Sequence, residues 1–316
     1  MSAVTASTQR GSFVHPALFY RGDAEYLAGL VPFVEEGLSR QEPVAVAVPA
    51  ARLAMLSGAL GSASGKVRLI DMSVAGRNPG RIIPGVLRDF ADRYPDRHVR
   101  IIGEPVWLGR SAKEYPACAQ HEALINRSFD GRDATIVCPY DADRLSDRML
   151  SDARATHPLV WEGEQASASG DYAPDRVVAE YNEPLRSPLD AAEFLVDKES
   201  DLPVVRRFAA GHAERMGLAS DRVADLVLIV NELATNSVVH ARSSARVRIW
   251  FEAADGDVVC EVHDGGFLAD PLAGRRPSPP GRLGGRGLLL VNELADLVRT
   301  YTSPSGTTLH VHCHVS

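Results

Sequence analysis

Cysteine is scarce in this sequence, and its four copies are not spaced as a redox pair or a zinc ribbon. Cys118, Cys138, Cys260 and Cys313 lie far apart, with no C-x-x-C arrangement among them. Small secreted proteins use closely spaced cysteines as a disulfide framework, whereas scattered cysteines are typical of reduced proteins. We therefore expect four reduced thiols in the interior of a cytoplasmic protein.

Long apolar runs and an excess of positive charge are also missing. The richest apolar stretch, 44–60, is interrupted by Pro49 and Arg52, and residues 1–13 do not contain the apolar core of a signal peptide. The 34 basic side chains against 41 acidic ones give a net charge of −7, which is unfavourable for binding a phosphate backbone. The sequence thus predicts no membrane anchor and no direct nucleic-acid partner.

What is present is the composition of an ordinary globular protein, with enough length for two domains. The chain has 316 residues, of which 45% are hydrophobic and 24% charged. Periodicity predicts helices at 23–40, 50–60, 82–93, 113–129 and 143–155, and strands at 43–48, 67–72, 99–102 and 134–138. This alternation indicates an α/β domain whose mainly parallel sheet is covered on both faces.

The composition changes to Ser, Gly, Pro and Asp between residues 161 and 189. Such a stretch is typical of a linker, although Val177, Val178, Tyr181 and Leu185 could dock part of it on a domain as a short helix. We expect a first domain at 11–160, a linker at 161–189 and a second domain at 190–316.

The first domain carries no complete nucleotide-binding or hydrolase motif. Residues 61–66, Gly-Ser-Ala-Ser-Gly-Lys, are one residue short of a phosphate-binding loop and precede a strand instead of following one. Val67 also stands where such a loop has the Ser or Thr that ligates Mg²⁺. We reject this segment as a nucleotide site. The first domain also shows no Ser-His-Asp elbow and no His/Cys cluster with the spacing of a metal site.

A helical stretch in the second half brings two polar side chains onto one face. Apolar or small residues recur at three- and four-residue steps from about 222 to 240, which predicts an amphipathic helix. Glu232 and Asn236 are four residues apart, so their side chains lie one turn from each other. An amide oxygen can ligate Mg²⁺, and a carboxylate can orient or deprotonate a nucleophile. Taken alone, an ordinary surface helix explains this pair better.

Two glycine-containing segments follow this helix in order and favour a nucleotide site. Residues 258–263 form a predicted strand that ends in Asp264-Gly265-Gly266, where a carboxylate can accept a hydrogen bond from adenine and glycine lets the base approach the backbone. Gly284-Gly285-Arg286-Gly287-Leu288 opens a helix, whose free N–H groups and dipole favour phosphates. The segment between them, 267–283, is long for a connection, which indicates either a functional lid or a disordered segment.

These three segments resemble the motifs of the GHKL (Bergerat-fold) ATPase superfamily. Within it, the pattern Glu-Leu-x-x-Asn-x-x-x-His-Ala resembles the anti-sigma-factor serine kinases. The resemblance covers about 190–316 and implies an α+β sandwich that binds ATP and Mg²⁺. It gives Glu232 the role of general base and Asn236 that of Mg²⁺ ligand. The sequence departs from the family at Leu268, where the adenine box often has a second glycine.

The same resemblance implies a set of nucleotide-binding residues. Asp264 would anchor the adenine. Gly285 and Gly287 match the family's second glycine box, which would hold phosphates, and Arg282 or Arg286 could supply charge from the lid. The implied cofactor-binding residues are Asn236, Asp264, Gly266, Gly285, Arg286, Gly287 and Leu288.

The first domain has a resemblance of its own, to the MEDS sensory domain. It depends on the runs His15–Tyr20, Cys138–Asp141 and His157–Pro158 and spans about 11–160. It implies a sensor of a small ligand or of a partner. A ligand could bind where strand ends open a crevice, although core or turn positions explain these residues equally well. The candidate sensory residues are His15, Tyr20, Tyr140 and His157.

The rest of the second half predicts a strand at 193–196, a helix at 201–216 and hairpins at 245–263 and 298–315. The last strand places His310, His312 and His314 on one face, which we expect to be the open side of the sheet. Three histidines in this arrangement can hold a metal, but a solvated or subunit-contacting face is more common. Mg²⁺ is the one metal that the sequence leads us to assign.

The resemblances together imply an ATP-dependent anti-sigma factor and serine/threonine protein kinase. It would bind a sigma factor, phosphorylate a small antagonist protein under control of the sensory domain, and could form a homodimer. A non-catalytic ATP-gated interaction module is an alternative. A sensor histidine kinase fits less well, because no histidine lies between His157 and His212 to serve as phosphoacceptor.

Overall fold

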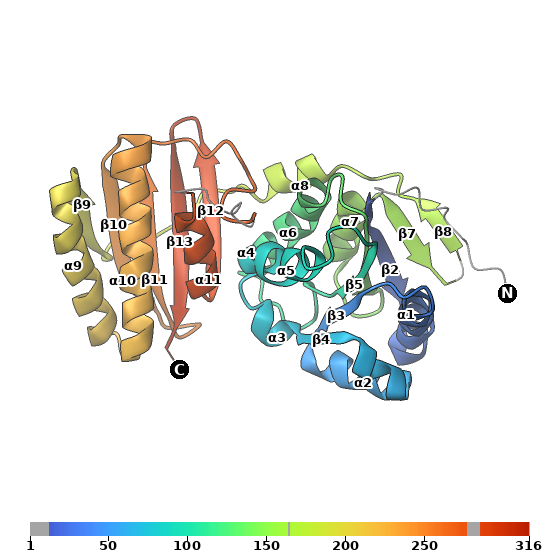
Figure 1. Ribbon diagram of the computed structural model, residues 1–316. Coiled ribbons are helices and arrows are strands. Elements are labelled where there is room, and N and C mark those ends of the chain that lie inside the picture. The colour runs from blue at the N-terminus through green and yellow to red at the C-terminus, as the bar shows by residue number, and fades with distance from the viewer. Residues whose placement is uncertain (1–12, 164, 277–284, 316) are drawn as a thin grey trace. The chain divides into compact units, whose positions relative to one another are not determined.

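The chain forms two units, one from each half, and each has hydrophobic core residues of its own (Figure 1). The computed structural model describes residues 13–163, 165–276 and 285–315. The first unit ends at Tyr181 and the second begins at Asn182. All four cysteines are buried and outside disulfide bonds, as the sequence predicts.

The central strands of the first unit are almost wholly apolar, as expected for parallel strands covered on both faces. The strand order is β4-β3-β5-β6-β2-β7-β8, with β1 beside β6. Every strand pair in the described part of this sheet is parallel except β7–β8. The strands are β1 (Phe13–Val14), β2 (Pro16–Tyr20), β3 (Val44–Val48), β4 (Arg68–Asp71), β5 (Val99–Gly103), β6 (Ala134–Asp141), β7 (Leu159–Glu162) and β8 (Gln165–Ala168). The predicted mainly parallel sheet is confirmed.

Helices cover both faces of this sheet. Leu30 of α1 and Leu56 of α2 belong to the same core as Val46 and Val137, while Cys138, which follows Val137, faces α6 on the other side. The helices are α1 (Gly22–Ser39), α2 (Ala50–Leu60), α3 (Met72–Ala75), α4 (Pro79–Ile82), α5 (Asp89–Ala91), α6 (Tyr115–Ser128), α7 (Asp147–Thr156) and α8 (Pro174–Glu180), with short turns η1 (Gly61–Lys66) and η2 (Ile83–Arg88). The rejected phosphate loop is η1, a partly exposed turn ahead of β4.

The segment expected to be a linker, 161–189, is largely part of the first unit. β7 pairs with β2 and turns back into β8, and α8 follows. Val177 is fully buried, and the Tyr181 hydroxyl donates a hydrogen bond to Asp152. The expected docking of part of this stretch as a short helix through Val177 and Tyr181 is confirmed. The boundary of the first unit falls at residue 181 instead of 160, because a few buried side chains anchor a stretch whose other residues are polar.

An antiparallel sheet with helices on one face forms the second unit. The strand order is β12-β13-β11-β10-β9, and every pair in it is antiparallel. The strands are β9 (Ala192–Val196), β10 (Ala245–Glu252), β11 (Asp257–Asp264), β12 (Leu297–Ser303) and β13 (Gly306–His314); the helices are α9 (Leu202–Arg215), α10 (Ser220–Thr235) and α11 (Gly287–Leu294), with short turns η3 (Glu199–Asp201) and η4 (Asn236–Ala241). Both predicted hairpins are present, the first turning at Gly256 with φ +70°. This arrangement agrees with the expected α+β sandwich.

The helix formed by α10 and η4 is long and apolar. Ser220–Ala241 spans 22 residues with a mean hydropathy of 1.2, enough to cross a membrane by length and composition alone. Val223, Leu226, Val230 and Leu233 of this helix belong to the core of the second unit. Packing against the sheet thus accounts for its apolar face.

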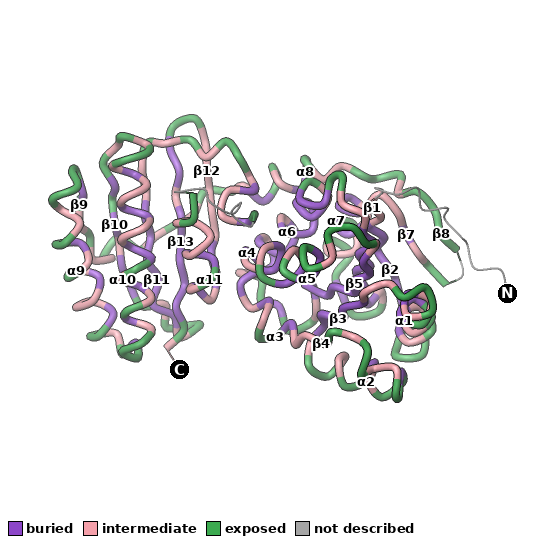
Figure 2. Tube along the Cα trace, in the orientation of Figure 1, coloured by how far each residue is buried: buried purple, intermediate pink, exposed green. Residues whose placement is uncertain are grey.

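The face of the sheet opposite the helices carries the three histidines of β13, but it is not solvated as expected. His310 and His312 are buried, and Figure 2 shows β13 buried along most of its length. The His310 ring lies 2.8 Å from Glu261 Oε2, and His312 Nδ1 lies 3.3 Å from Asp257 Oδ2. Each of these two histidines therefore has a carboxylate partner, and His314 alone of the three is exposed.

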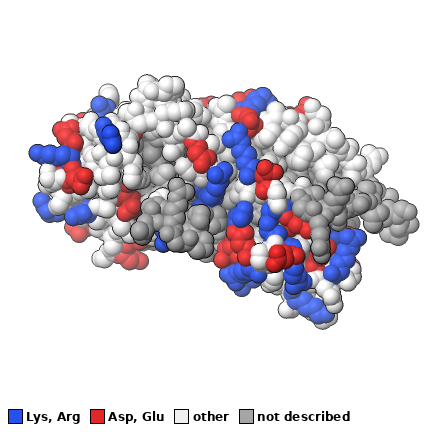
Figure 3. Space-filling view, turned by 45° about the horizontal axis from the view of Figure 1, so that its top comes forward, with Lys and Arg blue, Asp and Glu red and all other residues white. Residues whose placement is uncertain are grey.

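Charged side chains of both signs are interspersed on the visible faces of the two units (Figure 3). Elsewhere in the described part of the chain, charged side chains four residues apart form ion pairs, such as Arg88 with Asp92 and Arg93 with Asp89. Exposed pairs of this kind contribute little to stability.

Candidate functional site

A change of helix type marks the position of Asn236. The α-helix α10 ends at Thr235, and the chain continues as the π-helical turn η4. The turn ends at Arg242, whose φ of +51° closes it in the left-handed region. Such π-turns occur mostly as single insertions in helices and often at functional sites.

The side chains of Glu232 and Asn236 meet the second glycine box at Gly287, the first residue of α11. A Cβ at Gly287 would lie 2.7 Å from Glu232 Oε2 and 3.3 Å from Asn236 Nδ2. This close approach explains why glycine stands here. The Glu232 carboxylate thus lies beside the N-terminus of α11, where the helix dipole favours negative charge.

Asp264 stands at the end of β11 with its carboxylate fixed by two donors. Oδ2 accepts a hydrogen bond from Ser237 Oγ at 2.5 Å, and Oδ1 accepts one from the Gly266 amide at 2.7 Å. A carboxylate can accept about four hydrogen bonds, so it keeps capacity for a ligand. A Cβ at Gly266 would lie 2.7 Å from Ala241 Cβ, which accounts for the second glycine after Asp264.

A cavity of about 580 Å³ joins these elements. Its volume is in the range of small-molecule sites. Leu233, Val262 and Leu309 form apolar parts of its wall, a suitable surface for a flat base. Six of the candidate nucleotide-binding residues line it, namely Asn236, Asp264, Gly266, Gly285, Gly287 and Leu288.

Arg286 is not among the cavity-lining residues. It is exposed at the N-cap of α11. Arg282 and Gly284 lie outside the described residues.

The described part of the expected lid, 267–276, is attached to the start of α11. Gly274, with φ +72°, passes so close that a Cβ there would lie 2.6 Å from Leu288 Cβ. The Asn292 amide donates to the Gly274 carbonyl at 3.0 Å. At the other end the Leu268 amide donates to Thr302 Oγ1. These contacts hold both ends of the segment over the cavity.

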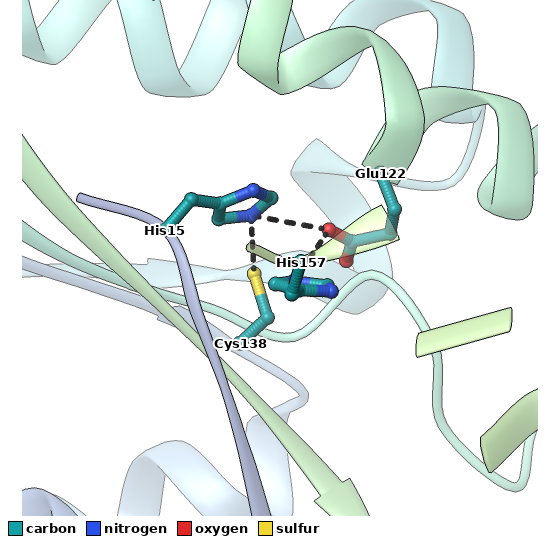
Figure 4. A group of neighbouring side chains, drawn as sticks. All are labelled: His15, Glu122, Cys138 and His157. Carbon is teal, nitrogen blue, oxygen red and sulfur yellow. Dashed lines mark hydrogen bonds and ion pairs between the residues drawn. The ribbon is translucent and has the colours of Figure 1, made fainter. Parts of the chain in front are cut away.

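In the first unit, three of the four candidate sensory residues come together. His15 directly precedes β2, His157 lies just before β7, and their ring centroids are 4.0 Å apart (Figure 4). The Tyr140 ring contacts His157 edge-on at 5.5 Å. All three are buried within the unit, as the alternative of core positions predicts.

Glu122 from α6 and Cys138 from β6 complete this group, and we call His15, Glu122, Cys138 and His157 the buried His-Glu-Cys cluster (Figure 4). Burial, the largest cause, lowers the pKa of His15 to about 4. Burial also raises the pKa of the Cys138 thiol well above its ordinary value. Both groups are therefore neutral at neutral pH.

Tyr20 lies in a different group, at the carboxyl ends of the parallel strands. Its hydroxyl accepts a hydrogen bond from Arg52 Nη2 at 3.3 Å, and its ring packs edge-on against Tyr26. The Tyr26 hydroxyl donates to Glu104 Oε2 at 3.1 Å. Burial raises the pKa of the Glu104 carboxyl group to about 8, with Arg52 acting in the opposite direction.

The sequence reading missed three residues of these sites: Glu122, Cys138 as a neighbour of the histidines, and Ser237 as the partner of Asp264. A signal was present for Glu122, which stands as a carboxylate on the buried side of α6, next to Ala123 and Leu124. Carboxylates are seldom fully buried unless they are paired. The other two become neighbours only through tertiary contacts.

Known protein families match both halves of the chain. Residues 14–158 match the family model of MEDS, the methanogen/methylotroph, DcmR sensory domain, and residues 195–312 match that of the histidine kinase-like ATPase domain. Among curated proteins, no significant match to the chain is found.

One solved structure similar to part of the chain contains the RsbU and RsbW domains of Rv1364c from Mycobacterium tuberculosis. The similarity covers 41% of this chain and 33% of that chain, with 20% sequence identity and a TM-score of 0.30. The chain thus spans about a third of the length of that structure. Residues 14–158 form a MEDS domain, and they are followed at 195–312 by a histidine-kinase-like ATPase domain, a domain type that implies ATP binding.

Proposed function

We propose that the second unit binds Mg-ATP in the 580 Å³ cavity and transfers its terminal phosphate to a serine or threonine of a partner protein. The main support for this proposal is that Glu232, Asn236 and Gly287 lie in close contact. They lie next to a cavity that is also lined by Asp264. These residues come from three separate segments of the chain. Their convergence supplies an acceptor for adenine, an amide oxygen for a cation and free helix N–H groups for phosphates.

Each residue has a specific task in this proposal. Asp264 accepts a hydrogen bond from the adenine amino group, while Ser237 and the Gly266 amide hold its carboxylate in place. The amides at the start of α11, from Gly287 onward, bind phosphate oxygens. Asn236 contributes its amide oxygen to Mg²⁺, which when bound neutralises phosphate charge. Phosphoryl transfer depends mainly on such positioning and charge neutralisation.

Glu232 is the residue that distinguishes a kinase from a simple binder of ATP. Its carboxylate is half-buried and lies beside Gly287, where the phosphates would sit. A carboxylate so placed repels phosphate oxygens, so it contributes nothing to binding. It can accept the proton of a substrate hydroxyl as that oxygen attacks phosphorus, a role typically worth about 10²–10⁴-fold in rate.

Partners follow from the motif resemblance of residues 232–241 to the anti-sigma-factor serine kinases. In this proposal the chain binds a sigma factor and phosphorylates a small antagonist of that interaction. The MEDS domain would bias one of these activities through its ligand.

An ATP-gated interaction module is the second candidate function. It is favoured by the contacts of the loop 267–276 with α11 through Gly274, Leu288 and Asn292. A nucleotide between these elements would change the loop, and the loop could change affinity for a partner. Phosphate transfer to a partner protein separates the two functions, because only the kinase requires it.

Calorimetric titration of the full chain with ATP in the presence of Mg²⁺ tests the site itself. Asp264→Asn replaces an acceptor with a group that is partly a donor, and we expect ATP affinity to fall at least about tenfold, as for a lost charge-assisted hydrogen bond. Asn236→Ala should reduce affinity only when Mg²⁺ is present. Asp221→Asn, at the opposite end of α10, is the matched control. Unchanged affinity in both site variants would refute the assignment.

A further inference from the structure

The buried His-Glu-Cys cluster of the first unit places four metal-ligating side chains around one point (Figure 4). One ligand atom from each of His15, Glu122, Cys138 and His157 lies within 4.8 Å of all the others. Each residue is at most 1% exposed. Polar atoms at such depth need partners, because water does not reach them freely.

The tautomer of His15 is set by Asn126. The Asn126 amide nitrogen donates to the carbonyl oxygens of Thr156 at 2.7 Å and Ala123 at 3.3 Å. Its amide oxygen therefore faces His15 Nδ1, at 3.1 Å, and Nδ1 must carry the proton. The neutral ring then directs the lone pair of Nε2 into the cluster.

His157 is held in the same tautomer by the backbone. Its Nδ1 lies 2.8 Å from the carbonyl oxygen of Ala153, which can only accept. Nδ1 is thus the donor, and Nε2 again presents a lone pair to the cluster. In metal sites a histidine usually donates its other ring N–H to a carbonyl or carboxylate in this way, which orients the ring.

The Glu122 carboxylate faces these two lone pairs. Its Oε2 lies 3.3 Å from His157 Nε2 and 3.5 Å from His15 Nε2. Within the described residues, neither oxygen of Glu122 nor His157 Nε2 makes a hydrogen bond of normal geometry. Acceptors facing acceptors in a buried site repel one another. A proton on His157 would relieve one of these contacts, whereas a divalent cation at the centre would relieve all of them.

Three of the six distances between the ligand atoms agree with a tetrahedral ion, and all six are within 4.8 Å. Zinc binds nitrogen and oxygen at about 2.0 Å and sulfur at about 2.3 Å, which puts tetrahedral ligand atoms about 3.3–3.6 Å apart. Cys138 Sγ lies 3.5 Å from His15 Nε2, in line with the two carboxylate distances. We propose that His15, Glu122, Cys138 and His157 bind one Zn²⁺ ion in a closed four-ligand site.

Charge is balanced in this site. On binding, the Cys138 S–H bond breaks, its proton leaves to solvent, and a sulfur–zinc bond forms with no change in oxidation state. The thiolate and the Glu122 carboxylate each contribute one negative charge and cancel the two positive charges of the ion. A neutral complex is the arrangement that a buried site tolerates best.

The ligands come from four separate places in the first unit. His15 precedes β2 and His157 precedes β7, while Cys138 lies on β6 and Glu122 on α6. With four protein ligands no position is open for a catalytic water, which indicates a structural role. Because the ligands come from α6 and from the strands, the ion would link α6 to the sheet. Metal binding is then linked to the stability of the MEDS domain.

The test uses the full chain without an affinity tag. After removal of bound metal with a chelator, the chain is titrated with Co²⁺ as a spectroscopic probe and then with Zn²⁺ as competitor. We expect one equivalent of tetrahedral Co²⁺ with a thiolate-to-cobalt charge-transfer band, and its displacement by one equivalent of Zn²⁺. No binding, or binding without the thiolate band, would overturn the proposal, and this readout needs no variant.

Two cysteine variants locate the site. Cys138→Ser should abolish the charge-transfer band and weaken Zn²⁺ binding more than about 100-fold, because even changes next to a ligand cost 10–100-fold. Cys118→Ser, at another buried cysteine of the same unit, should leave both unchanged. Circular dichroism checks that each variant is folded. An undiminished band in folded Cys138→Ser would contradict the assignment.

Discussion

At the scale of single residues, Glu104 is a carboxyl group whose ionisation opposes folding. It is 3% exposed, and burial raises its pKa from an ordinary 4.5 to about 8. Between these values the folded chain binds more protons at this position than the unfolded chain. Stability is therefore present at low pH and is lost as pH rises through 8. His15, whose pKa is lowered to about 4, has the opposite effect below pH 6.5.

Part of the effect of Glu104 falls in the pH range from 6.5 to 8. We expect the free energy of unfolding of the first unit to fall by about 1.5 kcal/mol over this range, given 1.36 kcal/mol for each pKa unit. Glu104→Gln, which resembles the protonated group, should remove this dependence. Urea unfolding at several pH values measures it, with Glu35→Gln on the exposed side of α1 as control. A slope that persists in Glu104→Gln would show that another group is responsible.

Residues differ in how far their roles could be predicted from the sequence. Glu232 and Asn236 could be placed together because a helix fixes the direction of side chains four residues apart. Asp264 and Gly287 could be assigned from short sequence motifs. In each motif glycine has a local function, since it allows a ligand to approach the backbone closely. Glu122 could not be linked to His15, since the contact joins segments more than a hundred residues apart and no local pattern encodes it.

At the scale of elements, α10 is the helix that carries the proposed catalytic residue and packs against the sheet. Leu226 is fully buried in the core, whereas Leu228, half a turn away, is 40% exposed. Deleting a buried leucine side chain typically costs about 2–5 kcal/mol through lost burial and an internal cavity. The position of Leu226 therefore makes it a test of this packing.

We expect Leu226→Ala to lower the free energy of unfolding of the second unit by about 2–5 kcal/mol. Leu228→Ala, the matched change on the same helix, should cost less than about 1 kcal/mol. Chemical denaturation with a probe specific to the second unit gives both values. Equal costs would mean that α10 does not pack against the sheet as described.

Elements with regular periodicity could be predicted closely, and irregular ones could not. Helix α2 begins and ends at the predicted residues, Ala50 and Leu60. In the segment 161–189 the polar composition predicts a linker, and the apolar residues Val177 and Tyr181 predict the docked helix α8, but nothing in the segment predicts the strands β7 and β8. Its strand β7 is specified by pairing with β2, which is a property of the sheet and not of the segment itself.

At the scale of the whole molecule, two separate cores predict two unfolding events. A ligand that binds only the folded second unit stabilises that unit by about 2.7 kcal/mol at a hundred times its dissociation constant. We expect two calorimetric transitions. Mg-ATP should raise the midpoint temperature of one by several degrees and leave that of the other unchanged. Asn236→Ala should reduce the shift. Equal shifts in both transitions would indicate that the units unfold together or that ATP also binds the first unit.

The most direct test of the kinase proposal compares wild-type chain with Glu232→Gln. The substitution keeps the shape of the side chain beside Gly287 but removes its basicity. Transfer of labelled phosphate from ATP is measured to small antagonist proteins that the chain captures from native cytosol, and ATP affinity is measured in parallel. We predict unchanged or slightly tighter ATP binding and a transfer rate lower by about 10²–10⁴-fold. Transfer at the wild-type rate would contradict the role of Glu232, and a wild-type chain that binds ATP but transfers no phosphate would establish the ATP-gated module instead.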